Sequence, residues 1–323
     1  MLKKQNLSIL DSKMRLFCAK IVVVFFLFGL LNCLILTIIP KDYNSLSYEY
    51  NDKLDLLKNT PSPRVVVFGG SNVANGVDSK RIADALNCNV VNLGLHIGIG
   101  IKYPLEDCFN YIKKGDIILL QCEYDLFYKN WDGNGSKLAH LIATVDKKNF
   151  SILSLRQWTK VASGTPQVCI GYLIRLVKAL KSGSFDSPSS SDEYHFVRDG
   201  FNEYGDEVAH LRYPNKPMMA PSKSDLGEVD KSFTKWLHET ILKYENVGVK
   251  VIMVPPVIVS SYFEAHYSEE IKNSLTRINH PYVVPPLYMA LDDSVYFDSC
   301  YHVDKEGVRQ NTDHLIEILR KQI

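Results

Sequence analysis

The sequence lacks an excess of charge of either sign. Its 323 residues include 37 Lys and Arg against 36 Asp and Glu. Proteins that bind nucleic acid usually gather a basic excess on one face, so we expect no nucleic-acid partner. The sequence also lacks any spacing of cysteine and histidine that is typical of a zinc site. We therefore expect neither a metal ion nor another cofactor.

Cysteine is sparse, and its pattern does not indicate a disulfide framework. There are seven cysteines and no C-x-x-C pair, and an odd number cannot all pair within one domain. We expect buried free thiols with at most one bridge. Two of the seven, Cys18 and Cys33, lie in or beside an apolar N-terminal segment. The other five are Cys88, Cys108, Cys122, Cys169 and Cys300.

Charge is absent from one long run, Ile21 to Pro40, which consists almost entirely of Ile, Val, Phe and Leu. About 20 such residues span a bilayer as a helix. The alternative is a cleaved signal peptide, whose apolar core is usually about 7–15 residues long and precedes a small-residue cleavage site. This run is longer and no Ala-x-Ala pattern follows it, so we expect a retained membrane anchor.

The charges that flank the apolar run predict its orientation. Five basic residues precede it, and the residues after it are of mixed charge. Because positive charge stays in the cytoplasm, we expect a single-pass protein of the inner or plasma membrane whose larger part is periplasmic or extracellular. The predicted parts are a cytoplasmic N-terminus (1–20), an anchor (21–40), a stalk (41–63) and an extracytoplasmic domain (64–323).

Short runs rich in β-branched residues alternate with helical patterns in the domain, as at Val65–Phe68, Asn89–Gly94 and Ile117–Gln121. This alternation indicates an α/β fold with a central parallel sheet and helices on both faces. The first and third runs are too apolar for a sheet edge. We therefore expect Val65–Phe68 in the interior of the sheet, with Ile117–Gln121 beside it.

The alternation is interrupted around residues 151–227, which we interpret as an insertion between strands. Residues 167–178 are apolar and mildly basic, which is typical of a helix that either packs in the domain or rests on a membrane surface. Residues 182–191 are rich in Ser with Gly and Pro and predict a flexible loop. The pattern of strands and helices resumes after residue 231.

A serine at the end of the first strand is the main catalytic candidate. Two glycines precede Ser71, and the far end of the chain supplies Asp298 and His302. A serine hydroxyl needs a base to remove its proton, and an acceptor must hold that base in the correct tautomer. Strand ends of a parallel sheet line a common crevice, so these three side chains can converge. Taken singly, a turn serine and a surface histidine are the simpler interpretations.

Four segments in this order resemble the motif blocks of the SGNH/GDSL hydrolase superfamily, and more narrowly its membrane-anchored members that act on cell-envelope polymers. The resemblance covers about residues 64–323. The four segments are Gly69-Gly70-Ser71-Asn72, Val91-Asn92-Leu93-Gly94-Leu95, Gly115 to Asp125, and Asp298 to His302.

The resemblance implies a flavodoxin-like three-layer sandwich in which Ser71 is the nucleophile, His302 the base and Asp298 its acceptor. It also implies that the backbone N–H groups of Ser71 and Gly94 bind the oxyanion. The third block departs from the family pattern, because Glu123-Tyr124-Asp125 stands where the family presents an asparagine donor. Asn72 or Tyr124 is the candidate replacement.

The last block also departs from the family pattern. The acid of the family lies three residues before the histidine, where this chain has Ser299, so Asp298 is our candidate and Asp293 a weaker one. Four further residues are candidates for substrate binding, and each has a structural alternative: a turn, a helix contact or ordinary loop polarity. They are His96, Glu123, Tyr124 and Asp206.

The resemblance implies a membrane-anchored serine enzyme that acts on an envelope polysaccharide or exopolysaccharide. The acyl group passes either to a sugar hydroxyl, as in an O-acyltransferase, or to water, as in an esterase, and the sequence leaves both open. A membrane protein that supplies the acyl donor is an expected partner. The alternative is a catalytically inactive carbohydrate-binding or scaffold subunit of a polysaccharide export or modification machine.

Overall fold

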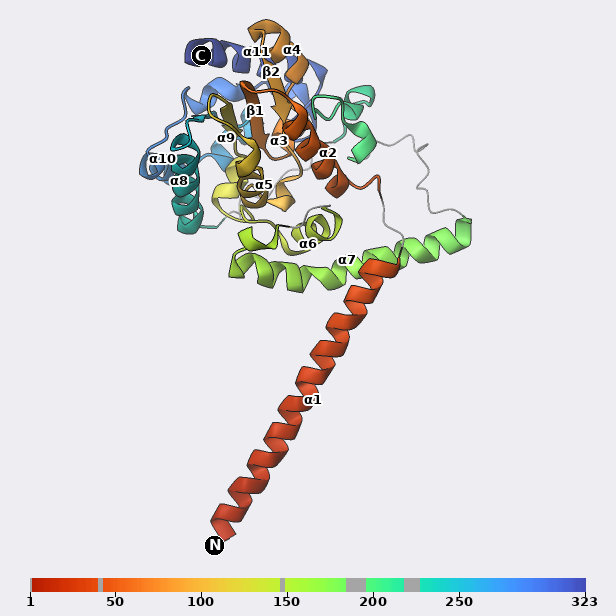
Figure 1. The fold of residues 1–323 in the computed structure, drawn as a ribbon. Coiled ribbons are helices and arrows are strands. Elements are labelled where there is room, and N and C mark those ends of the chain that lie inside the picture. The colour runs from red at the N-terminus through yellow and green to blue at the C-terminus, as the bar shows by residue number, and fades with distance from the viewer. Residues whose placement is uncertain (1, 40–42, 146–148, 184–195, 218–226) are drawn as a thin grey trace. The chain divides into compact units, whose positions relative to one another are not determined.

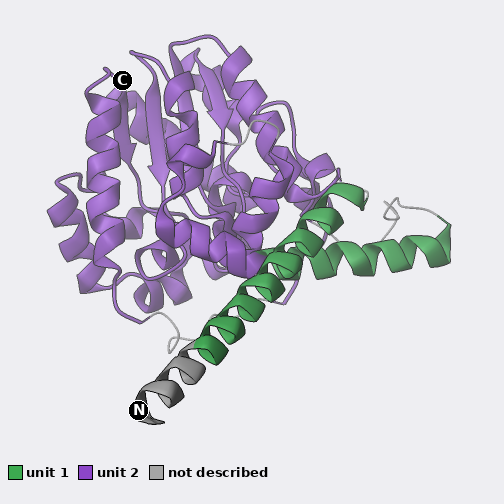
Figure 2. Cartoon of the chain, turned by 60° about the horizontal axis from the view of Figure 1, so that its bottom comes forward, with its two compact units in different colours: residues 1–42, 165–189 green, residues 43–164, 190–323 purple. Residues whose placement is uncertain are grey.

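The computed structural model of the chain describes five stretches (Figure 1): residues 2–39, 43–145, 149–183, 196–217 and 227–323. It divides into two compact units, which are coloured in Figure 2. Unit 1 comprises residues 1–42 and 165–189, and unit 2 comprises residues 43–164 and 190–323. Most of the loop predicted at residues 182–191 lies outside the described residues.

Unit 1 contains the predicted anchor. Helix α1 (Leu2–Ile38) is continuous, and its part from Ser12 to Ile38 is long and apolar enough to cross a membrane. Its large apolar side chains are exposed, as Phe25 and Phe26 illustrate at 70% and 69%. The unit also contains the second part of α7 (Leu155–Ser182), which includes the helix predicted at residues 167–178.

Unit 2 is built on a four-stranded parallel sheet in the order β2-β1-β3-β4. The predicted interior pair is confirmed, because β1 and β3 lie side by side and Val65 is opposite Ile117. The segment predicted as an insertion falls between β3 and β4, which are neighbours in the sheet. The strands are β1 (Arg64–Gly69), β2 (Asn89–Asn92), β3 (Ile117–Gln121) and β4 (Lys250–Met253).

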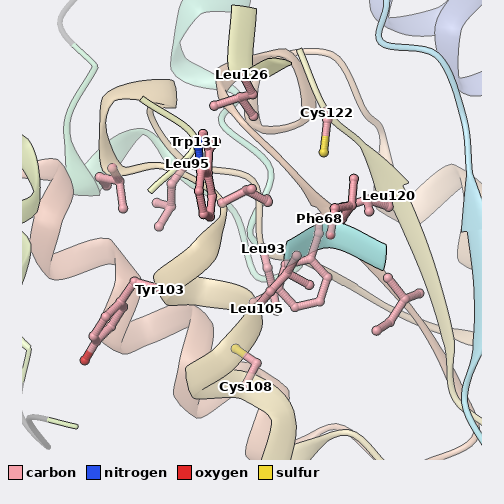
Figure 3. Packing of buried hydrophobic residues seen from close by; sticks show 14 of the residues in the cluster. Phe68, Leu93, Leu95, Tyr103, Leu105, Cys108, Leu120, Cys122, Leu126 and Trp131 are labelled. Atoms are coloured by element: carbon pink, nitrogen blue, oxygen red, sulfur yellow. The ribbon is translucent and has the colours of Figure 1, made fainter. Parts of the chain in front are cut away.

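Alternate residues of the strands enter two separate hydrophobic clusters. Val66 and Phe68 of β1 belong to the larger cluster, part of which is shown in Figure 3, and Val65 and Val67 belong to the other. Since successive side chains of a strand point to opposite faces, both faces of the sheet are covered. This explains why β1 has an uninterrupted apolar sequence.

Helices supply much of the rest of both clusters. The larger cluster contains residues of α2 (Leu46–Asn59), α5 (Lys102–Cys108), α6 (Gly135–Thr144), α8 (Lys231–Glu245), α9 (Ser260–His266) and α10 (Glu269–Ile278). The smaller contains residues of α3 (Ser71–Ala74), α4 (Ser79–Leu86) and the C-terminal α11 (Lys305–Gln322). All seven cysteines are described, and all are free thiols.

The stalk expected at residues 41–63 is wrong. Leu46–Asn59 forms helix α2, and its residues Tyr50, Leu54 and Leu57 are part of the larger hydrophobic cluster. The segment looked polar because its apolar residues are spaced at three and four positions. That spacing puts them on one helix face and leaves charged residues on the other.

The burial of α2 predicts a large effect of a single truncation. Leu57 is fully buried and Leu56 is only half-buried. We expect Leu57→Ala to lower the free energy of unfolding by about 2–5 kcal/mol, because it leaves a cavity in the core, and Leu56→Ala to cost clearly less. Chemical unfolding of the full-length protein in detergent measures both. Equal, negligible effects would instead indicate a stalk.

Candidate active site

Ser71 lies at the carboxyl end of β1, where the chain turns into the short helix α3. The turn needs a glycine because of a close approach: a Cβ added to Gly70 would lie 2.4 Å from Glu123 Oε1. Glu123 follows β3, the neighbouring strand, so the sheet register sets the carboxylate against the serine turn. The glycine therefore permits the contact between the two strand ends.

His302 and Asp298 face each other across a small antiparallel pair, β7 (Tyr296–Ser299) and β8 (His302–Val303). Asp298 Oδ1 lies 2.6 Å from His302 Nδ1. Partial burial acts to raise the pKa of Asp298, but the hydrogen bond and charge of His302 and the nearby Lys216 outweigh it and lower that pKa. Asp298 therefore remains a carboxylate that accepts the Nδ1 proton and leaves Nε2 free to act as a base.

Ser71 and His302 line the same cavity, which has a volume of about 350 Å³. A slightly larger hollow of about 370 Å³ lies elsewhere, between Tyr267 and Pro286, and contains no acid–base pair. The chemistry therefore belongs to the smaller cavity. Its lining residues are Ser71, His96, Ile97, Glu123, Asp125, His266, Ser299, Cys300, Tyr301 and His302.

The Ser71 hydroxyl bonds to Glu123 in this structure. Ser71 Oγ donates to Glu123 Oε1 at 3.2 Å, and the backbone N–H of Asn72 donates to the same oxygen at 3.0 Å. Within the described part of the chain, Ser71 and His302 share no hydrogen bond. In this structure the Ser71 hydroxyl is therefore bonded to a buried carboxyl group and not to the histidine.

Burial dominates the ionisation of Glu123. It raises the pKa of this carboxyl to about 7, although the Asn72 N–H, His302 and Ser71 act to lower it. Glu123 therefore changes charge near neutral pH, directly beside the nucleophile candidate. Below that pH the cavity contains a neutral acid at this position, and above it a carboxylate.

The raised pKa of Glu123 predicts how stability depends on pH. In the folded protein the Glu123 carboxyl binds its proton more tightly than in the unfolded chain. Its contribution to the free energy of unfolding is therefore complete below about pH 4.5 and is lost as the pH rises to about 7. The loss amounts to about 3 kcal/mol at 1.36 kcal/mol per unit. We expect Glu123→Gln to remove this loss, so that the stability of the variant relative to the wild type increases between pH 4.5 and 8.

Thermal unfolding of both proteins across that pH range measures the gain. Glu239→Gln, an exposed position on α8, is the matched control and should follow the wild-type curve. Parallel curves for Glu123→Gln and the wild type would show that burial does not raise this pKa.

His96 presents a hydrogen-bond donor to the cavity. Its Nδ1 accepts from the Gly98 N–H at 2.8 Å, so the ring proton is on Nε2. Burial, with Lys137 and His302 nearby, lowers the pKa of His96 to about 4. The ring is therefore neutral at physiological pH, and its Nε2–H is a donor without a full positive charge.

Two of the predicted oxyanion donors are occupied by other partners. The Gly94 N–H donates to Asn92 Oδ1 at 2.8 Å, and Gly94 packs so closely that a Cβ would lie 2.5 Å from Ala74 N. The Asn72 amide donates to the Gln121 carbonyl at 3.1 Å, and its oxygen accepts from Gly70. Both expectations are corrected: these groups fix the turn around Ser71.

The Ser71 N–H has no hydrogen-bond partner among the described residues.

Two of the predicted substrate-binding residues lie away from the cavity. Tyr124 is fully buried and packs edge-on against Phe263 and at a tilt against Tyr267, as expected of a core aromatic. Asp206 is buried and accepts hydrogen bonds from Ser79 and Asn92, which tie the insertion to the sheet. Burial raises the pKa of Asp206, although these hydrogen bonds act to lower it. We correct both assignments, whereas His96 and Glu123 do line the cavity.

Sequence reasoning gave no role to Asp125, His266 and Tyr301, which also line the cavity. His266 ends α9 and stands alone in the sequence, without a motif that would have singled it out. Asp125 and Tyr301 lay inside recognised motif blocks but outside the positions that carry roles in the family. Within the described ranges, no group of three or more His, Cys, Asp or Glu side chains is arranged to hold a metal ion.

No protein-family model matches the chain, and no curated protein sequence matches it either. The functional argument therefore depends on the cavity itself.

Proposed function

We propose that the chain is a membrane-anchored serine acyl-transfer enzyme, an O-acyltransferase or esterase that acts on an envelope polysaccharide or exopolysaccharide. The observation that carries this is the cavity shared by Ser71 and the His302–Asp298 pair at the carboxyl end of β1. The parallel sheet covered on both faces and the four motif segments support a flavodoxin-like domain of SGNH/GDSL type, with which this chemistry agrees.

In the proposed reaction, the Ser71 hydroxyl leaves Glu123 and turns to His302 Nε2. His302 takes its proton, the oxygen attacks the ester carbonyl, and Asp298 stabilises the imidazolium that forms. His302 then protonates the leaving alkoxide. In the second half of the reaction, a hydroxyl or a water molecule attacks the acyl-enzyme and returns a proton to Ser71 through His302.

Two donors on the cavity side serve the oxyanion in this mechanism. The Ser71 N–H has no partner in the described part of the chain, and the Nε2–H of His96 replaces the asparagine donor that the third block lacks. Each such donor is worth about 10²–10³ in rate. Glu123 limits the same step, because its carboxylate repels the developing negative charge. We therefore expect the oxyanion to be stabilised best where Glu123 is protonated.

One observation favours a second candidate function. The Ser71 hydroxyl is bonded to Glu123, which stands where the family presents a donor. A site fixed in this state would not form an acyl-enzyme. The domain would then be a catalytically inactive carbohydrate-binding or scaffold subunit of a polysaccharide machine.

Ester hydrolysis separates the two functions. The full-length protein in detergent is mixed with p-nitrophenyl acetate, before and after treatment with a serine-directed phosphonate. The enzyme proposal predicts nitrophenol release that the phosphonate abolishes. Release no faster than in buffer, from protein shown by its melting transition to be folded, would favour the binding subunit.

The charge pattern around α1 predicts the topology. Basic residues precede the span (Lys13, Arg15 and Lys20 among them), so we expect residues 43–323 outside the cytoplasm. A reporter enzyme that is active only outside the cytoplasm, fused after Ile323, should be active in cells. Activity only of a reporter that works in the cytoplasm would reverse the assignment.

A further inference from the structure

Among the described residues, three buried polar atoms of the cavity make no well-formed hydrogen bond: Asp125 Oδ2, His266 Nε2 and the Tyr301 hydroxyl, which faces Asp125. His266 is only 2% exposed, and its ring meets the Tyr301 ring edge-on at 5.6 Å between centroids. Buried polar atoms are nearly always paired in folded proteins, so a group of unpaired ones requires an explanation. All three residues line the cavity that contains Ser71.

The hydrogen-bonding role of His266 follows from its other nitrogen. Nδ1 lies 2.9 Å from the carbonyl oxygen of Tyr262, and a carbonyl can only accept, so Nδ1 carries the proton. In the neutral ring, Nε2 is therefore an acceptor. The ring is held in place by α9, whose last carbonyl receives a hydrogen bond from Tyr128.

The spacing of these atoms fits a ligand with two neighbouring hydroxyl groups. Asp125 Oδ2 and His266 Nε2 are 3.9 Å apart, too far to bond each other. Two acceptors at this separation can each receive a hydrogen from one hydroxyl of a vicinal diol. The Tyr301 hydroxyl can donate to an oxygen of the same ligand. A sugar offers this arrangement on most of its ring carbons.

We propose that Asp125, His266 and Tyr301 form an acceptor subsite, which binds the vicinal hydroxyls of a sugar or similar polyol to which the acyl group on Ser71 is transferred. This rests on the proposed function and selects transferase over esterase. An adjacent hydroxyl oxygen forms a bond to the acyl carbon, and the bond from that carbon to Ser71 Oγ breaks. The hydroxyl proton passes to His302 Nε2 and from there to Ser71 Oγ.

Matched acceptors test the subsite in the full-length protein in detergent. With p-nitrophenyl acetate as donor, mass spectrometry measures acetyl esters of 1,2,3-cyclohexanetriol, which carries a hydroxyl beside a vicinal pair, and of cyclohexanol. We expect the wild type to prefer the triol. Since one buried hydrogen bond is worth about tenfold, His266→Ala and Asp125→Ala should each reduce the preference by about that factor. His266→Gln, which retains an acceptor, should restore part of it.

The control is His280→Ala, a histidine that bonds Glu245 away from the cavity. Equal acylation of both alcohols by a wild type that hydrolyses the ester would overturn the subsite and leave the proposed function intact. If no ester is hydrolysed, saturation-transfer NMR with methyl glucoside decides. Binding that is lost in His266→Ala and retained in His280→Ala supports the subsite, and unchanged or absent binding overturns it.

A separate observation concerns α7 in unit 1. Val168, Cys169, Tyr172 and Ala179 are buried, and another face of the same helix exposes large aliphatic side chains. These are 40–75% exposed: Ile170, Leu173, Ile174, Val177 and Leu180. Residues 149–185 contain no Asp or Glu and five Lys or Arg. A basic helix with such an apolar face is typical of one that lies in a membrane interface.

The contact between α7 and α1 lies near the C-terminal end of the apolar span. The Cys169 thiol donates to the Asn32 carbonyl at 3.6 Å, and Asn32 is inside the apolar span. Asn32 precedes the end of α1 at Ile38 by six residues, or about 9 Å at 1.5 Å per residue. Interfacial helices bury their apolar face about 5–10 Å deep.

We infer that the apolar face of α7 is immersed in the outer surface of the membrane that α1 spans. Tryptophan quenching tests this with the full-length protein in nanodiscs of phosphatidylcholine and phosphatidylglycerol with brominated acyl chains. After subtraction of the wild-type signal, Ile174→Trp should lose most of its fluorescence. Gly171→Trp is the control, since Gly171 lies on the side of Lys178 and has open space around it. Two unquenched tryptophans would overturn the inference.

Discussion

Replacement of Ser71 by alanine is expected to lower kcat/KM for ester hydrolysis by at least about 10⁴-fold. The variant lacks the oxygen that carries the acyl group in the proposed mechanism, and what remains is the contribution of the oxyanion donors and of binding. His302→Ala should lose a similar factor. The double variant should lose no more than either single one, because a nucleophile and its base act as a unit. Initial rates with p-nitrophenyl acetate measure all three.

Ser151→Ala is the matched control, since this serine is exposed and lies outside the cavity. It should hydrolyse the ester at the wild-type rate. Losses that add up in the double variant would mean that Ser71 and His302 act separately. In that case Glu123, which is already bonded to the hydroxyl, would be the better candidate for the base.

Asp298→Asn is expected to cost almost as much as loss of the histidine, on the order of 10³–10⁴ in kcat. The amide retains the shape of the side chain but presents an N–H to His302 Nδ1. The ring proton then moves to Nε2, which can no longer accept the proton of Ser71. Because Asp298 Oδ1 and His302 Nδ1 are only 2.6 Å apart, an amide N–H at this position forces the ring proton onto Nε2.

Asp293→Asn is the matched control for Asp298→Asn. Asp293 is the other acid near the last block, and its carboxylate accepts from the Ser261 N–H outside the cavity. It should retain wild-type activity. If Asp293→Asn loses activity and Asp298→Asn retains it, the acid has been assigned to the wrong residue. The kcat of each variant, with its melting temperature, distinguishes a catalytic loss from unfolding.

The sequence predicted the sheet well because its interior strands have a strong local pattern. Residues 65–68 and 117–120 are apolar on both faces, a pattern typical of a strand that is covered on both sides. The same strands carry Ser71 and Glu123 at their carboxyl ends, so the approximate position of the cavity also followed. Asp298 and His302 are close in sequence and meet through one tight antiparallel turn.

The rest depended on contacts that no local pattern encodes. The polar composition of α2 predicts a stalk, whereas the burial of residues such as Leu57 depends on tertiary packing in the core. Whether an N–H is available depends on its neighbours: the Gly94 N–H is taken by Asn92, and His96 gains its role through the Gly98 N–H. His266 reaches the cavity from α9, far from every motif in the sequence.

The central claim is that Ser71 is a nucleophile activated by His302. Mass spectrometry of the full-length protein after reaction with a serine-directed phosphonate tests it most directly, because the adduct identifies the reacting atom. We expect one adduct, on the peptide that contains Ser71, with labelling strongly slowed in His302→Ala and absent in Ser71→Ala. A folded wild type that carries no adduct, or an adduct that persists in Ser71→Ala, would contradict it.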